Sequence, residues 1–168
     1  VTYSNHIALS RLADNKANML ISINGLIISV MIAIVTRTGA VSWALLPVVV
    51  LVGGATVSLA FAVIAARPRL GNGAVTLEQV RSGTGNLLFF GQFTTMPLEE
   101  FQESLKVLRQ DPELMYAHLG RQLYHMGESL SGKYRRLQTA YGVFLGATAL
   151  AAALFVAMYV TGSLTPPV

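Results

Sequence analysis

The sequence predicts an all-α membrane protein with three transmembrane helices and a helical segment between the second and the third. Hydrophobic residues make up 53% of the 168 residues and charged residues only 12%, about half the roughly 25% that is usual in soluble domains. The apolar residues also gather in long runs, because 29 uncharged residues separate Arg37 from Arg67 and all 32 residues after Arg136 are uncharged. A soluble chain of this length has no core thick enough to bury two such runs.

The predicted spans are residues 18–36, a stretch within residues 43–66, and residues 140–160. With its flanks, each is long enough at about 1.5 Å per residue to cross a hydrocarbon core of roughly 30 Å. Pro68 helps to end the second span, and Gly162 with Pro166 ends the third. The first stretch is longer than the apolar region of a signal peptide and no clear cleavage site follows it, which favours a true span.

Lysine and arginine predict which side of the membrane each connection faces. Eleven of the twelve basic residues lie before the first span or between the second and third spans, and only Arg37 lies in the loop after the first span. The sequence therefore predicts a membrane protein with a cytoplasmic amino terminus, a cytoplasmic central segment and a carboxyl tail on the outer side. In a chain with so few charges, the net charge of +4 favours membrane topology over binding to a nucleic acid polymer.

The domain organisation follows from these spans as residues 1–66, 67–136 and 137–168. In the central segment, VTLEQV and LLFFGQF lie between turn-forming residues, so the region near 75–93 is either a small β-hairpin or loop on the membrane interface. A short helix follows, with Leu98, Phe101, Leu105 and Leu108 as its apolar stripe. Asp111 and Pro112 then begin one continuous helix to Val160, about 70 Å long, whose first half forms a hairpin with the shorter helix.

Candidate chemistry on this segment is weak, and the sequence predicts no enzyme, no metal and no cofactor. The chain has no cysteine, and the residues from Gly127 to Lys133 match a P-loop except that Tyr134 replaces the hydroxyl residue and no strand precedes them. His118, Arg121, His125 and Glu128 share one face of the long helix. His125 and Glu128 could bind a metal together, but no third ligand is evident, which favours a solvated polar face.

A better candidate is a small anionic ligand at the membrane border. Basic residues at that border are expected to meet anionic headgroups, and the same cations could also hold a phosphate while aromatic rings stack on a base. The residues predicted for this site are Lys16, Phe89, Phe90, Lys133 and Arg136.

Small and polar residues within the spans predict close helix packing, either within one chain or between copies in a homo-oligomer. Asn24 is expected to find a polar partner on another helix, because an amide in hydrocarbon is costly to leave unpaired. The residues predicted for helix packing are Asn24, Gly54, Ser58, Ala62, Gly142 and Gly146.

Three segments together resemble the transmembrane effectors of Pycsar anti-phage systems: RLADNKANMLISINGLIISV, NLLFFGQFTTMPLEEF and LGRQLYHMGESLSGKYRRLQTAYGVFLG. The similarity covers residues 11–146 and supplies no site residues. It implies that a partner cyclase makes cyclic CMP or cyclic UMP on infection and that the effector responds by impairing the inner membrane. The competing interpretation is a non-catalytic membrane anchor or adaptor for a separate enzyme.

Overall fold

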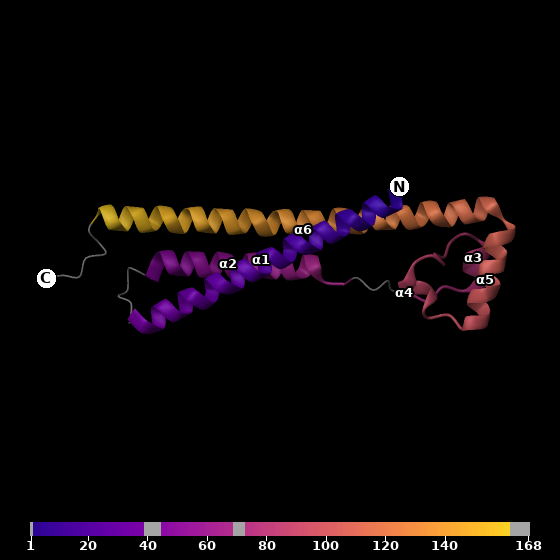
Figure 1. Ribbon diagram of the computed structural model, residues 1–168, viewed down its shortest axis with the longest axis horizontal. Helices are drawn as coiled ribbons and strands as arrows, with labels where there is room; N and C mark the ends of the chain where they lie inside the picture. Colours follow the sequence, from indigo (N-terminus) through magenta and orange to yellow (C-terminus); the bar gives the residue numbers. More distant parts are fainter. Residues whose placement is uncertain (1, 39–44, 69–72, 162–168) are drawn as a thin grey trace. The chain divides into compact units, whose positions relative to one another are not determined.

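The computed structural model describes residues 2–38, 45–68 and 73–161, and these residues form helices without any strand. The helices, labelled in Figure 1, are α1 (Thr2–Thr38), α2 (Leu45–Ala66), α3 (Leu77–Arg81), α4 (Phe90–Phe93), α5 (Leu98–Gln110) and α6 (Pro112–Val160). The predicted all-α class and the long last helix are confirmed, with α6 uninterrupted over 49 residues.

Three of these helices are long and apolar enough to cross a membrane, as the sequence predicts: Tyr3–Arg37, Leu45–Ala66 and Pro112–Val160. In α1, Lys16 and Arg37 are 21 residues apart, which is about 31 Å at 1.5 Å per residue and matches a hydrocarbon core of roughly 30 Å. Trp43 and Ala44, at the start of the stretch predicted for the second span, lie outside the described residues.

The chain divides into two compact units. The membrane unit contains residues 7–67 and 132–168, and the central unit contains residues 1–6 and 68–131. Helix α6 contributes its first part to the central unit and its second part to the membrane unit.

In the membrane unit, α1, α2 and the second part of α6 pack through one buried cluster of Leu20, Ala62 and Ala140. Helices α1 and α2 are antiparallel, because Leu20 packs with Ala62 whereas Asn24 bonds to Ser58. Helices α2 and α6 are also antiparallel, because Ser58 bonds to Ala140 whereas Gly54 lies against Ala147. Helices α1 and α6 therefore run in the same direction. Many of the buried residues are alanine, which lets helix backbones approach closely. Large apolar side chains such as Met19, Leu26 and Leu145 are instead exposed, as expected for a surface that faces lipid.

In the central unit, α3, α4, α5 and the start of α6 enclose a second core of Val75, Val80, Leu87 and Leu108. The side chain of Thr76 caps α3 by accepting from Gln79 N, and the Gln79 side chain accepts from Thr76 N in return. The carboxylate of Glu100 in α5 accepts from Leu77 N at 2.8 Å, which ties α5 to the start of α3.

The region near 75–93 is neither β-hairpin nor simple loop. VTLEQV forms the approach to α3 and most of that helix, and LLFFGQF forms a turn followed by α4. The side chains of Thr76 and Asn86 satisfy backbone amides locally, because Asn86 Oδ1 accepts from Leu88 N at 3.1 Å. These local hydrogen bonds replace the ladder that a strand pair would supply.

The predicted apolar stripe of α5 is wrong in part. Leu98 and Leu105 are 64% and 40% exposed, whereas Ser104 and Leu108 are buried and Phe101 is half-buried. Residues 101, 104 and 108 lie on one face at helical spacing, so the face that packs on the core is rotated from the predicted one. Ser104 is fully buried in this face, and its Oγ has no hydrogen-bond partner among the described residues.

The predicted solvated polar face of α6 is also wrong where it begins. His118 is 1% exposed, and its Nε2 lies 3.2 Å from the carbonyl oxygen of Val80 at the end of α3. One turn later, Gln122 is 8% exposed and its Oε1 accepts from Asn86 Nδ2 at 2.7 Å. These polar side chains are buried because the turns around α3 bring carbonyl and amide groups into the core, and buried polar groups need partners.

Candidate functional site

A buried polar node joins all three spanning helices. Asn24 Nδ2 in α1 donates to Ser58 Oγ in α2 at 3.0 Å, and Ser58 Oγ donates to the carbonyl oxygen of Ala140 in α6 at 2.9 Å. Asn24 and Ser58 are both fully buried, and Asn24 Oδ1 has no hydrogen-bond partner among the described residues. The hydroxyl of Ser58 therefore acts as donor and acceptor at once and links α2 to both α1 and α6.

The small residues of α2 lie at the contact with the other helices. Ala62 is 0% exposed and packs in the cluster with Leu20 and Ala140. A Cβ atom added to Gly54 would collide with Ala147 Cβ and would lie 3.5 Å from Ala147 Cα, so only glycine fits there without a shift of the helices. Gly54, Ser58 and Ala62 thus form the close α2 contact within one chain.

Gly142 and Gly146 lie differently. Both are exposed, and a Cβ atom added to either would meet no described atom within 4 Å. Among the residues that the structure describes, this part of the α6 surface is therefore open at Gly142 and Gly146.

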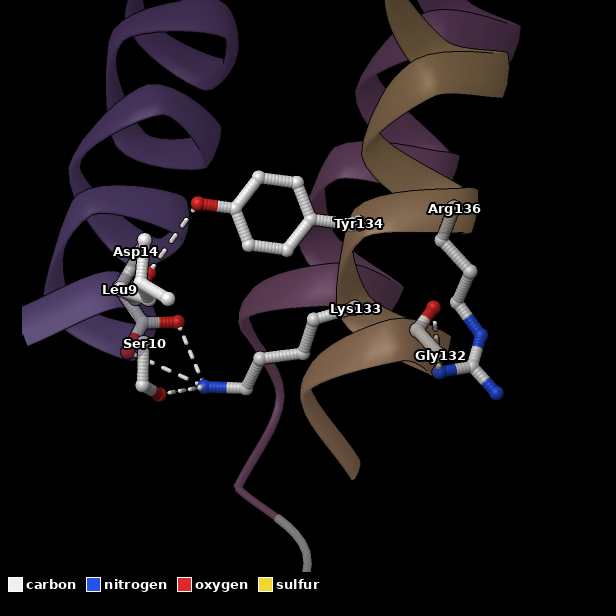
Figure 2. A network of polar contacts seen from close by, with 7 residues as sticks. All are labelled: Leu9, Ser10, Asp14, Gly132, Lys133, Tyr134 and Arg136. Carbon is white, nitrogen blue, oxygen red and sulfur yellow. Dashed lines mark hydrogen bonds and ion pairs between the residues drawn. The ribbon is translucent and has the colours of Figure 1, made fainter. Parts of the chain in front are cut away.

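Lys133 in α6 forms an ion pair with Asp14 in α1 at one end of the membrane unit (Figure 2). Its Nζ lies 2.8 Å and 3.1 Å from the two carboxylate oxygens of Asp14 and 3.3 Å from Ser10 Oγ. The side chain of Lys133 is 17% exposed and that of Asp14 is 39% exposed, so water screens the pair only in part. The positive charge of Lys133 is thus used within the chain, to fasten α6 to α1.

Two tyrosines add contacts between the same helices. Tyr134 Oη donates to the carbonyl oxygen of Leu9, and Tyr141 Oη donates to the carbonyl oxygen of Lys16, each at 3.4 Å.

Two basic side chains make no ion pair with an acidic group in the described part of the chain. Arg136 donates from Nη1 to the carbonyl oxygen of Gly132 in its own helix, at 3.4 Å. Figure 2 shows the guanidinium of Arg136 directed away from Lys133. The side chain of Lys16 is exposed and makes no ion pair with a described residue.

The predicted ligand residues divide between the two units. Lys16, Lys133 and Arg136 belong to the membrane unit, whereas Phe89 and Phe90 belong to the central unit. Phe89 is half-buried, and its backbone amide donates to the carbonyl oxygen of Asn86 at 3.3 Å. Phe90 begins α4. Nucleotide binding by these five residues stays a prediction.

Sequence reasoning missed Asp14 as a partner of Lys133, because the two residues lie 119 positions apart. One signal was available: Asp14 is the only acidic residue among the 98 residues of the membrane unit, where an unpaired carboxylate would be costly.

In residues 2–38, 45–68 and 73–161, neither the His/Glu pair nor the P-loop-like segment has the geometry of its motif. These residues contain no group of three or more side chains placed to hold a metal ion, and the exposed pair of His125 and Glu128 stands alone at 3.5 Å. The segment from Gly127 to Lys133 is helical throughout, so its amides follow the helix rather than a phosphate-binding loop.

Comparisons with known proteins give one match. No curated protein and no solved structure matches the chain. A family model described as the Pycsar effector protein domain matches residues 1–161, which is nearly the whole chain. Together with three helices able to span a membrane, this match confirms the resemblance found in the sequence: the chain belongs to the Pycsar effector family and is a membrane protein of anti-phage defence.

Proposed function

We propose that this effector is activated by a cyclic pyrimidine nucleotide, cyclic CMP or cyclic UMP, and that it then impairs the integrity of the inner membrane through oligomerised transmembrane helices. The observation that carries the proposal is the match of residues 1–161 to the effector family, combined with three spans joined at one buried node. A partner cyclase would make the nucleotide on infection, and the protein itself would act without catalysis.

The node supports a resting state in which the three spans of one chain are closed on one another. Its hydroxyl and amide are completely buried, so each copy in this state presents mainly apolar side chains to lipid. Separating the helices would expose Asn24 and Ser58, and polar side chains in a membrane favour contact with water or with polar groups of another copy. A change that opens the node would therefore supply the polar surface that a water-filled defect needs.

Homo-oligomer formation has its best support in the exposed glycines of α6. Gly142 and Gly146 are four residues apart on one helix face, and a Cβ atom added to either would meet no described atom within 4 Å. Small residues at this spacing allow two membrane helices to approach closely. We therefore assign the contact between copies to Gly142 and Gly146, and the contact within one chain to Gly54, Ser58 and Ala62.

For the nucleotide, the predicted basic residues of the membrane unit offer positive charge. Lys16 and Arg136 make no ion pair with a described residue, so each has positive charge left for a phosphate. Lys133 reaches a ligand only by giving up Asp14. Such an exchange would loosen α1 from α6 and would link nucleotide binding to the packing of the spans. The amino terminus and central unit would then face the cytoplasm, where the nucleotide is made.

A membrane adaptor for a separate enzyme is the second candidate. One observation favours it: the central unit exposes the large apolar side chains Leu98, Leu105, Tyr116 and Tyr124, at 64%, 40%, 75% and 69%. If these side chains form one continuous patch, the patch would be typical of a surface that binds another protein.

Dye release from liposomes separates the two candidates. The purified chain, reconstituted alone in vesicles loaded with a fluorescent dye, should release the dye when cyclic CMP or cyclic UMP is added and retain it with cyclic AMP. An adaptor would retain the dye under all three conditions, although it would be inserted to the same extent. Vesicles without protein serve as the control for leakage caused by the nucleotide.

A further inference from the structure

The charges of the membrane unit gather at one end and are almost all positive. The unit contains seven basic residues and one acidic residue, which leaves six net positive charges, whereas the whole chain carries +4. Arg37 lies at the far end of α1. The other six basic residues belong to the opposite end, as the helix contacts show.

Residues of three helices share one level at this end. Leu20, Ala62 and Ala140 pack in one cluster. Lys16 precedes Leu20 by four residues, Arg136 precedes Ala140 by four, and Arg67 follows Ala62 by five. Because α2 runs opposite to α1 and α6, all three cations lie on the same side of the cluster, about 6–8 Å from it along the helix axes.

Arg11 and Arg135 lie slightly farther out. Arg11 lies in α1 between Leu9 and Asp14, which contact Tyr134 and Lys133 in α6. Arg11 is about 7.5 Å from Lys16 along the helix. This distance is close to the thickness of a headgroup region, about 5–8 Å on each side of a bilayer. We name these five residues the cationic belt: Arg11, Lys16, Arg67, Arg135 and Arg136. The belt thus has the thickness of one headgroup layer.

None of the five belt residues forms an ion pair with a described residue. The only carboxylate in the unit, that of Asp14, is occupied by Lys133 at 2.8 Å and 3.1 Å. Arg11, Lys16, Arg67 and Arg135 are exposed, and Arg136 is half-buried. A cyclic nucleotide carries a single negative charge, so it cannot neutralise a belt of five cations on three helices. The phosphates of several lipid headgroups would match both the number of these cations and their common level.

We infer that the cationic belt binds the phosphates of anionic phospholipid headgroups, and that these lipids are part of the working protein. Charge complementarity supports this occupant, since each basic residue near an anionic membrane surface contributes about fivefold in affinity. Tyr134 and Tyr141 lie at the same level, and tyrosine is enriched where a protein meets the headgroups. This inference does not depend on the identity of the activating nucleotide.

Native mass spectrometry of the full chain tests the inference by counting bound phosphatidylglycerol and phosphatidylcholine. The test variant is Arg11→Gln with Arg135→Gln, because both side chains are exposed and neither belongs to the predicted nucleotide site. Its affinity for phosphatidylglycerol should fall about 25-fold while its weak binding of phosphatidylcholine stays the same. The matched control is Arg37→Gln at the other end of α1, which should retain the affinity of the parent.

Three results would overturn the inference. One is equal binding of phosphatidylglycerol by the double variant and the parent, with helix content unchanged by circular dichroism. Another is an equal loss in Arg37→Gln, which would mean that total charge matters and the belt does not. The third is displacement of the bound lipid by inorganic phosphate at micromolar concentration, which would make the belt a site for a soluble anion.

Discussion

Replacing Ser58 with alanine should destabilise the membrane unit more than the same replacement of an exposed serine. The change removes the acceptor of Asn24 Nδ2 at 3.0 Å and the donor to the carbonyl oxygen of Ala140 at 2.9 Å. Because Asn24 Oδ1 already has no partner, the whole amide would then be buried and unpaired. An unsatisfied buried polar group costs about 1–3 kcal/mol, whereas one hydrogen bond between membrane helices contributes only about 0.6 kcal/mol on average.

The expected loss for Ser58→Ala is therefore about 1–3 kcal/mol in the free energy of unfolding, measured by reversible denaturation in mixed micelles. In a chain that already carries Asn24→Leu, the same change should cost only about 0.6 kcal/mol, since the amide is gone and one bond remains to be lost. The matched control is Ser29→Ala, whose exposed hydroxyl only donates to Gly25 O in its own helix at 2.9 Å and should change stability by less than about 0.5 kcal/mol.

The reasoning fails if the effects of Ser58→Ala and Asn24→Leu add to within about 0.3–0.5 kcal/mol, because residues in one hydrogen-bonded network should couple. It also fails if Ser29→Ala costs as much as Ser58→Ala. Either result would mean that the three spans are held by packing alone.

Two further predictions concern packing and topology. Gly54→Leu should lower the stability of the membrane unit by about 1–3 kcal/mol, because the new side chain meets Ala147, whereas Gly53→Leu points into open space and should have little effect on thermal unfolding in detergent. A periplasmic reporter fused after Val168 should be active and one inserted at Gly73 inactive, as the distribution of basic residues predicts; the opposite pattern would contradict the proposed orientation.

The spanning helices and α5 could be predicted from the sequence because their signals are local, whereas α3 and α4 were not predicted. Uncharged runs reveal the spans, and Asp111 with Pro112 marks the start of α6, which begins at Pro112 and ends at Val160 as predicted. The side chain of Asp111 accepts from Leu114 N at 3.0 Å, which is the cap expected at that position.

The faces of the helices could not be predicted as well, because burial of a polar residue depends on partners far away in the sequence. His118 is buried against the carbonyl of Val80, 38 positions earlier, and Gln122 against Asn86, 36 positions earlier. Reasoning from the spacing of apolar residues places polar residues such as His118 and Gln122 on the solvent-exposed face. The same limit hid the pairing of Lys133 with Asp14, which changes the chemistry available at the predicted ligand site.

Membrane potential in living cells tests the central claim most directly. Bacteria that produce the chain would be loaded with a potential-sensitive dye, and cyclic CMP or cyclic UMP would be raised by an inducible cyclase, with an adenylate cyclase as the matched control. The account predicts rapid loss of potential with a pyrimidine cyclase and none with the adenylate cyclase. A potential that holds while the chain is in the membrane and the pyrimidine nucleotide is high would contradict it.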